Sequence, residues 1–179
     1  MAAEVIASAG HAVTLYEHMP SPARKLLMAG RGGLNLTHSE PLDRFLSRYG
    51  SEATAVREAV AAFPPDRVIG WAQGLGQETF TGSSGRVFPK AMKASPLLRA
   101  WLKRLDKLGV ELKTQHAWTG FSGARAIIVR TPDGSLLTIE PDAVILALGG
   151  ASWPKLGSDG AWVPLLHNAG VSEIGRAHV

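Results

Sequence analysis

The chain has 179 residues, of which 45% are hydrophobic and 19% charged, and its formal net charge is +4. This size and composition suit one soluble globular domain. The sequence contains no run of the ~20 apolar residues that a membrane span needs, and its first residues do not resemble the basic start of a signal peptide. The absence of Cys excludes disulfides, thiol nucleophiles and Cys-based metal sites. We therefore expect a cytoplasmic protein with no membrane partner. Its dispersed basic residues make nucleic acid an unlikely partner, although the mild positive charge favours anionic ligands slightly.

The first elements predict part of a nucleotide-binding unit. Residues 1–9 predict a helix that ends at Gly10, and residues 12–17 predict a strand that ends on Glu17. A small-residue helix, a short turn and a β-rich strand ending in an acid are typical of the second half of a dinucleotide-binding βαβ unit. In that unit the acid accepts hydrogen bonds from ribose hydroxyls. Glu17 is therefore a candidate ribose ligand, and the first strand with its G-x-G-x-x-G turn would precede Met1.

The stretch from Lys25 to Thr37 combines glycines with two cations, an Asn and a Thr. Glycines let backbone N–H groups approach a ligand closely, and consecutive N–H groups can form an anion-binding concavity. We interpret this stretch as a loop that wraps a dinucleotide. Composition alone leaves open the alternative of an ordinary surface loop.

The middle of the chain predicts mostly helices, over residues 41–50, 51–63 and 65–74, followed by short strands around a turn within residues 78–89. Ser95 is expected to cap the next helix, with Pro96 at its first position. We interpret the charged residues of that helix as its solvent-exposed face. Trp71 and Trp101, which both lie on predicted helices, are interpreted as core residues. Its expected buried stripe comprises Leu97, Leu98, Trp101, Leu102, Leu105 and Leu108.

The last third predicts strands. Residues 110–114 alternate as a strand, and residues 126–140 form a hairpin over Pro132-Asp133-Gly134. Residues 142–148 are almost continuously apolar, which indicates a strand buried on both faces of a parallel sheet, shared with residues 13–17. That strand runs into Gly149-Gly150, at the carboxyl end where open α/β sheets bind ligands. A helix with Pro164 in its first turn is expected over residues 161–169.

Four pieces in this order resemble the HI0933-like (YhiN/BaiN-type) flavoproteins, in the branch of uncharacterized flavoproteins. They are Glu17, the Lys25–Thr37 loop, Gly85–Pro89, and residues 147–154 with 157–160. The resemblance covers residues 1–171. It implies an α/β fold: an incomplete glutathione-reductase-like (Rossmann-type) FAD-binding domain. Residues 38–109 would be a mostly helical excursion, and residues 110–148 would supply strands that include a β-hairpin or meander.

The resemblance also implies a set of FAD-binding residues. Glu17 would bind the adenosine ribose, and Ala117, in the strand end 116–118, would lie along the adenine. Gly149 and Gly150 would form the turn that passes close to the cofactor, although Leu148 replaces a threonine of the family pattern. Trp118 and Trp153 flank these positions and could contact FAD. The remaining candidates are Lys25, Gly30, Arg31, Gly32, Gly33 and Asn35 in the loop, together with Ala147 and Asp159.

The implied function is FAD-dependent oxidoreduction, with NAD(P)H as a possible electron donor and an unsaturated small molecule as substrate. No catalytic residue can be named, and the six His form no metal-binding pair. A hydrolase is disfavoured because the chain has no G-x-S-x-G elbow. Two alternatives stay open: a flavoprotein that acts on RNA, and a non-catalytic fragment that cannot hold FAD.

The resemblance further implies a chain truncated at both ends. The first strand and most of the substrate domain would lie outside it, so we expect the isolated chain to purify without stoichiometric FAD. Residues 172–179 are expected to be a non-native tail, because Ile174–Val179 matches the translation of a common sequencing adapter.

Overall fold

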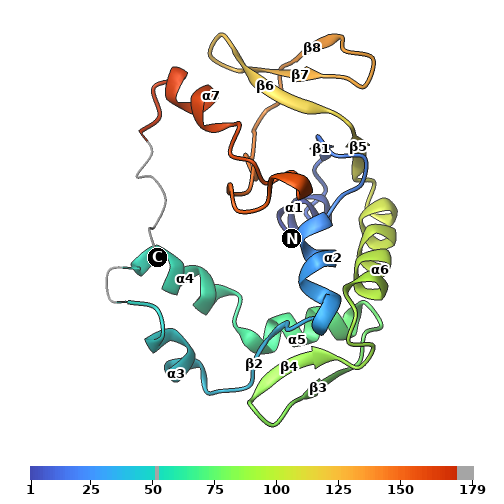
Figure 1. The fold of residues 1–179 in the computed structure, drawn as a ribbon, viewed down its shortest axis with the longest axis vertical. Coiled ribbons are helices and arrows are strands. Elements are labelled where there is room, and N and C mark those ends of the chain that lie inside the picture. The colour runs from blue at the N-terminus through green and yellow to red at the C-terminus, as the bar shows by residue number, and fades with distance from the viewer. Residues whose placement is uncertain (51–52, 173–179) are drawn as a thin grey trace. The chain divides into compact units, whose positions relative to one another are not determined.

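A computed structural model describes residues 1–50 and 53–172. The chain divides into two compact units, which are described separately: unit 1 combines residues 1–24 with the segment that begins at Val110, and unit 2 is Lys25–Gly109. The described strands form three small sheets. Both units contain helices as well as strands (Figure 1). The fold is mixed α/β, as predicted. The expected tail at residues 172–179 lies outside the described residues except for Ser172.

Unit 1 contains a parallel strand pair. Helix α1 (Ala2–Ser8) is followed by Gly10 at φ +88°, a left-handed conformation that glycine adopts without strain. Strand β1 (Thr14–Glu17) then pairs in parallel with β5 (Glu111–Thr114), so that Glu17 lies opposite Thr114. The predicted first helix and both strands are confirmed. Glu17 is the last residue of β1, which places it at the carboxyl end of the parallel pair.

Unit 1 also contains an antiparallel meander of β6 (Ala117–Ser122), β7 (Ala126–Arg130) and β8 (Leu136–Ile139). The predicted hairpin over Pro132-Asp133-Gly134 is confirmed, and Asp133 accepts hydrogen bonds from the Ser135 N–H and the Thr131 hydroxyl. Three of the four apolar residues of β7 are buried, Ala126, Ile127 and Val129. Central position and β-branched composition together explain this burial.

The predicted apolar strand over residues 142–148 is wrong. These residues form no strand, and the side chains of Val144 and Ile145 are 39% and 61% exposed. A strand exists only when a neighbour completes its backbone hydrogen bonds. Among the described strands, β1 pairs only with β5, and none pairs with residues 142–148. The chain then passes through a 3₁₀ turn, η2 (Pro154–Leu156), into helix α7 (Val163–Asn168), which confirms the predicted last helix.

Unit 2 begins with a helix where a loop was expected. Helix α2 (Arg24–Ala29) covers the first residues of the predicted loop, because Lys25–Ala29 are all good helix formers. The glycines follow in a 3₁₀ turn, η1 (Gly30–Gly32). A three-stranded antiparallel sheet comes next, with β4 (Arg86–Pro89) between β2 (Thr37–His38) and β3 (Thr79–Thr81). The short strands predicted around a turn are confirmed.

The helices of unit 2 are α3 (Leu42–Ser47), α4 (Thr54–Ala62), α5 (Pro65–Gly74) and α6 (Ala94–Lys107). The predicted cap at Ser95 is wrong: α6 starts at Ala94, with Lys93 at the N-cap. Pro96 is tolerated because it remains within the first turn, where no N–H is needed. Val56 of α4 and Phe63, which follows the helix, are exposed. The part of this predicted helix at residues 51–52 lies outside the described residues.

The core of unit 2 is a cluster built around α5 and α6. Its tryptophans, Trp71 and Trp101, pack edge to face with ring centroids 5.0 Å apart, in agreement with their predicted core role. The buried members of the cluster are Leu34, Ala72, Leu75, Ala94 and Leu97.

Within the described residues, no helix is both long and apolar enough to cross a membrane.

Candidate functional site

The carboxylate of Glu17 is held at the end of β1 by local contacts. Its Oε1 accepts a hydrogen bond from the Met19 N–H at 2.9 Å and lies 3.2 Å from Nδ1 of His18. The side chain remains 28% exposed. Among the described residues, both polar partners of this carboxylate contact Oε1. Oε2 is therefore available to accept a hydrogen bond from a ligand.

Ala117 lies next to Glu17 through the backbone. The His116 N–H donates to the Glu17 carbonyl at 3.0 Å, and Ala117 begins β6 immediately afterwards. The Tyr16 and His116 rings also approach, with centroids 5.8 Å apart. The structure thus brings together Glu17 and Ala117, two of the sequence-predicted site residues.

The glycine turn at residues 149–150 is tied to the following segment. Ser158, only 3% exposed, donates its Oγ–H to the Gly150 carbonyl at 2.9 Å. Trp153 and Ser158 also exchange two backbone hydrogen bonds of 3.1 Å each. A Cβ at Gly150 would meet nothing within 4 Å, whereas one at Gly149, where φ is +73°, would approach the Ser158 Oγ at 3.7 Å. The backbone at Gly150 is therefore open to a ligand.

Asp159 has a structural role in the described chain. Its Oδ1 accepts a hydrogen bond from the Ala161 N–H at 3.0 Å, an Asx-type turn that leads toward α7. The side chain is exposed. Asp159 therefore shapes the turn that carries Ser158, and this local role accounts for an Asp at this position.

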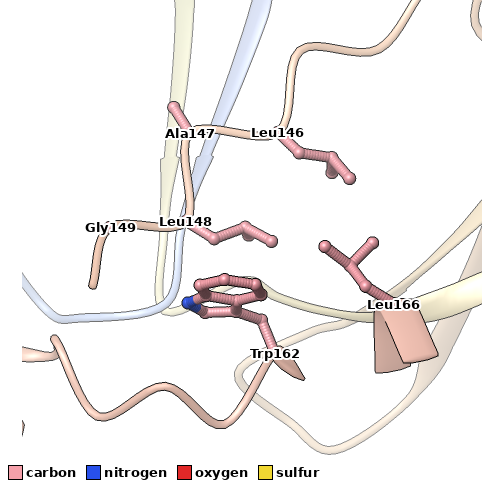
Figure 2. A pocket seen from close by; sticks show the side chains of 6 residues that line it. All are labelled: Leu146, Ala147, Leu148, Gly149, Trp162 and Leu166. Carbon is pink, nitrogen blue, oxygen red and sulfur yellow. The ribbon is translucent and has the colours of Figure 1, made fainter. Parts of the chain in front are cut away.

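A pocket of about 350 Å³ lies beside the same glycine turn (Figure 2). The side chains that line it are aliphatic apart from the indole of Trp162, whose Nε1 is buried and has no hydrogen-bond partner in the described chain. A buried N–H without a partner costs free energy. The pocket is lined by Leu146, Ala147, Leu148, Gly149, Trp162 and Leu166.

The remaining candidates lie in unit 2. Gly30 is fully enclosed: a Cβ there would lie 2.6 Å from the Ala94 Cβ, so packing alone requires glycine. Gly33, at φ +116°, similarly faces Met92, whereas Gly32 has open space around it. The exposed candidates of this unit are Lys25, Arg31, Gly32 and Asn35.

Sequence reasoning missed two residues of unit 1. Neither Trp162 nor His18 belonged to the predicted set, yet Trp162 lines the pocket and His18 contacts Glu17. The adjacency of His18 to Glu17 was the only available signal. Of the tryptophans that were expected to flank FAD, Trp118 has a buried Nε1 without a partner in the described chain, while Trp153 is 50% exposed. Across residues 1–50 and 53–172, no group of three His, Asp or Glu could hold a metal ion.

Comparison with known proteins identifies the domain type. The family model described as HI0933-like protein Rossmann domain matches residues 1–175. THI4 from Thermovibrio ammonificans aligns with a TM-score of 0.58 at 14% identity, over 96% of this chain and 58% of THI4. This likeness shows a common fold, and the chain spans little more than half of THI4. No curated protein matches the sequence significantly.

Two further structures are similar over 76% of this chain and 26% of their own length. They are BexE, studied for oxidation during BE-7585A biosynthesis (TM-score 0.44, 17% identity), and CabE, an aromatic hydroxylase from angucycline biosynthesis (TM-score 0.40, 18% identity). Such partial likenesses carry no weight for the fold or the function of this chain.

Proposed function

The chain belongs to the family of HI0933-like protein Rossmann domains, and from this premise we propose that it is the FAD-binding part of an oxidoreductase. The complete enzyme would take hydride from NAD(P)H and deliver it to an unsaturated small molecule. FAD supplies the redox chemistry when bound, and the protein supplies binding, orientation and the electrostatic environment.

The observation that carries this proposal is the position of Glu17. Its carboxylate lies at the carboxyl end of a parallel strand, where dinucleotide-binding folds place the acid that accepts ribose hydroxyls. Its Oε2 is available for that bond, since the Met19 N–H and His18 contact Oε1. The residues present therefore fit the adenosine half of FAD.

The glycine turn and its pocket support the same proposal. At Gly150 no side chain keeps a ligand from the backbone, and the turn is fixed by the buried Ser158 hydroxyl. The pocket beside the turn is lined by aliphatic side chains and an indole ring, as small-molecule pockets commonly are. In the complete enzyme these groups would bind and orient the cofactor, and the apolar walls would exclude water.

A titration of the apo chain with FAD tests the proposal. We expect saturable binding, and we expect Glu17→Gln to raise Kd by about tenfold, because an amide replaces a charged hydrogen-bond acceptor. Glu140→Gln is the matched control, since Glu140 is an exposed carboxylate of the same unit. Flavin fluorescence and calorimetry would both report Kd.

A failure of the wild-type chain to bind FAD at any accessible concentration would favour the alternative of a non-catalytic fragment. Equal affinities for the wild type and Glu17→Gln would remove Glu17 from the site. For the oxidoreductase activity, the full-length protein loaded with FAD should lose its absorbance near the visible flavin maximum when NADH or NADPH is added without oxygen. Persistence of that absorbance with both donors would contradict the hydride-transfer part of the proposal.

A further inference from the structure

The imidazole of His18 lies between two parts of the proposed site. On one side, Nδ1 is 3.2 Å from Oε1 of Glu17, the oxygen that also accepts the Met19 N–H. A carboxylate is only an acceptor, so the favourable tautomer of His18 in this contact carries its proton on Nδ1. The contact therefore restricts the direction in which the Glu17 carboxylate points.

On its other side, the ring lies against the backbone of Gly157. A Cβ at Gly157 would be 2.8 Å from Nε2 and 2.9 Å from Cε1 of His18, and 2.7 Å from Cγ of Met19. Gly157 has φ +88° and ends the η2 turn. Only glycine combines this backbone conformation with this close approach, so the turn is shaped to receive the imidazole edge.

The turn that receives His18 also holds the glycine pair. Ser158 follows Gly157 directly and donates its hydroxyl to the Gly150 carbonyl at 2.9 Å. A continuous set of contacts thus leads from the Glu17 carboxylate through His18 and Gly157 to Ser158 and Gly150. All of these residues belong to unit 1.

We propose that His18 is a positioning residue for the nucleotide, which holds the Glu17 carboxylate in its ribose-binding orientation and links it to the Gly149-Gly150 turn. This inference rests on the proposed function, in which Glu17 binds the ribose of FAD. An unrestrained glutamate loses side-chain freedom when it binds a ligand, and a contact already made in the free protein reduces that cost.

Substitutions at His18 separate the polar contact from packing. His18→Ala removes both, and we expect it to raise the Kd for FAD about three- to tenfold, because only the Met19 N–H would then restrain the Glu17 side chain. His18→Asn keeps a polar group near the Nδ1 position and should stay within about twofold of the wild type. His18→Gln places its amide near the Nε2 position instead and should resemble His18→Ala. Wild-type affinity in His18→Ala, or equal losses in the Asn and Ala variants, would overturn the proposal.

The contact with Gly157 has a matched test. Gly157→Ala drives a methyl group into His18 and Met19, whereas Gly170→Ala has a similar φ of +81° and nothing within 4 Å. Both variants carry the same backbone strain, so thermal unfolding should respond to both. Only Gly157→Ala should weaken FAD binding, and its effect should shrink in a His18→Ala background. Equal Kd values for the two glycine variants would contradict the link.

One readout does not depend on FAD. The Met19 N–H is bound to the Glu17 carboxylate, so its hydrogen exchange reports whether that carboxylate stays in place. We expect faster exchange at Met19 in His18→Ala and wild-type exchange in His18→Asn. Unchanged exchange in His18→Ala would overturn the inference. If the exchange responds but wild-type protein binds no FAD, the positioning contact stands and the proposed function fails.

Discussion

Helix α6 and the segment at residues 142–150 were both predicted from apolar patterns, and they differ in outcome. In α6 the residues of the expected stripe are buried or partly buried: Leu97, Leu98 and Leu105 are buried, and the other three are intermediate. The strand expected over residues 142–148 is absent, and Ile145 is 61% exposed. A helix makes its backbone hydrogen bonds within itself, whereas a strand takes them from another part of the chain. An apolar pattern is therefore a sufficient signal for the helix and an insufficient one for the strand.

The largest expected effect comes from truncating one apolar side chain in each region. Leu97→Ala should cost about 2–5 kcal/mol of unfolding free energy, because Leu97 is 1% exposed and lies in the core cluster. Ile145→Ala should change it by no more than about 0.5 kcal/mol, because that side chain is mostly in solvent. Urea unfolding measures both. A cost at Ile145 comparable with that at Leu97 would mean that residues 142–150 are buried in solution, which would break the comparison.

A smaller effect is expected from adding one methyl group beside each region. Gly30→Ala places a Cβ 2.6 Å from the Ala94 Cβ and 2.8 Å from the Ala94 N, at the start of α6. Backbone atoms cannot move aside cheaply, so we expect a loss of about 1–3 kcal/mol. Gly150→Ala, at the end of the apolar segment, meets nothing within 4 Å and should be nearly neutral. Neither glycine has a positive φ, so backbone strain does not contribute. The difference between the two unfolding free energies would therefore report only the room available for the added methyl group. Equal costs would contradict the packing difference.

Helix α3 offers the smallest and most specific test, because it has no buried residue. Glu40 lies two residues before α3, and its side chain is 5% exposed. The carboxylate accepts hydrogen bonds of 2.5 and 2.7 Å from Arg48, and its Oε2 lies 3.5 Å from Nε of Arg44. The Arg48 guanidinium holds the pKa of Glu40 below its usual range. The contribution of this carboxylate to stability is therefore complete above the ordinary glutamate pKa of about 4.3 and is lost as the pH falls through the lowered folded-state pKa.

Glu40→Gln should accordingly lower the melting temperature at neutral pH, and the difference from wild type should shrink in acid. Glu78→Gln is the matched control: the pKa of Glu78 is also lowered, by Lys90, but its side chain is 74% exposed. A solvated ion pair contributes little, so its effect should be the smaller of the two. A larger loss in Glu78→Gln would contradict the idea that the low exposure of the Glu40 side chain strengthens its ion pairs.

Much of the candidate site could be predicted only as separate pieces. Glu17 was predicted from its place at the end of a β-rich strand, and the structure confirms that strand, which pairs in parallel with β5 and not with residues 142–148. The resemblance implies Gly30 as a cofactor contact, and the structure shows that Ala94, sixty-four positions away in the numbering, fills the space beside it. A glycine required for packing and one required for a ligand have the same signature in sequence. Only the atoms around each glycine separate the two.

The sequence by itself determined several elements whose interactions are local: helix α6 with its apolar stripe, the turn at Pro132-Asp133-Gly134, and the acid at the end of β1. These rest on backbone hydrogen bonds and side-chain spacing within a few residues. The tertiary structure alone decided that residues 142–150 have no strand partner among those described, that His18 meets Gly157, and that the Trp162 N–H is buried beside the glycine turn. Each of these depends on contacts between distant parts of the chain, which no local pattern encodes.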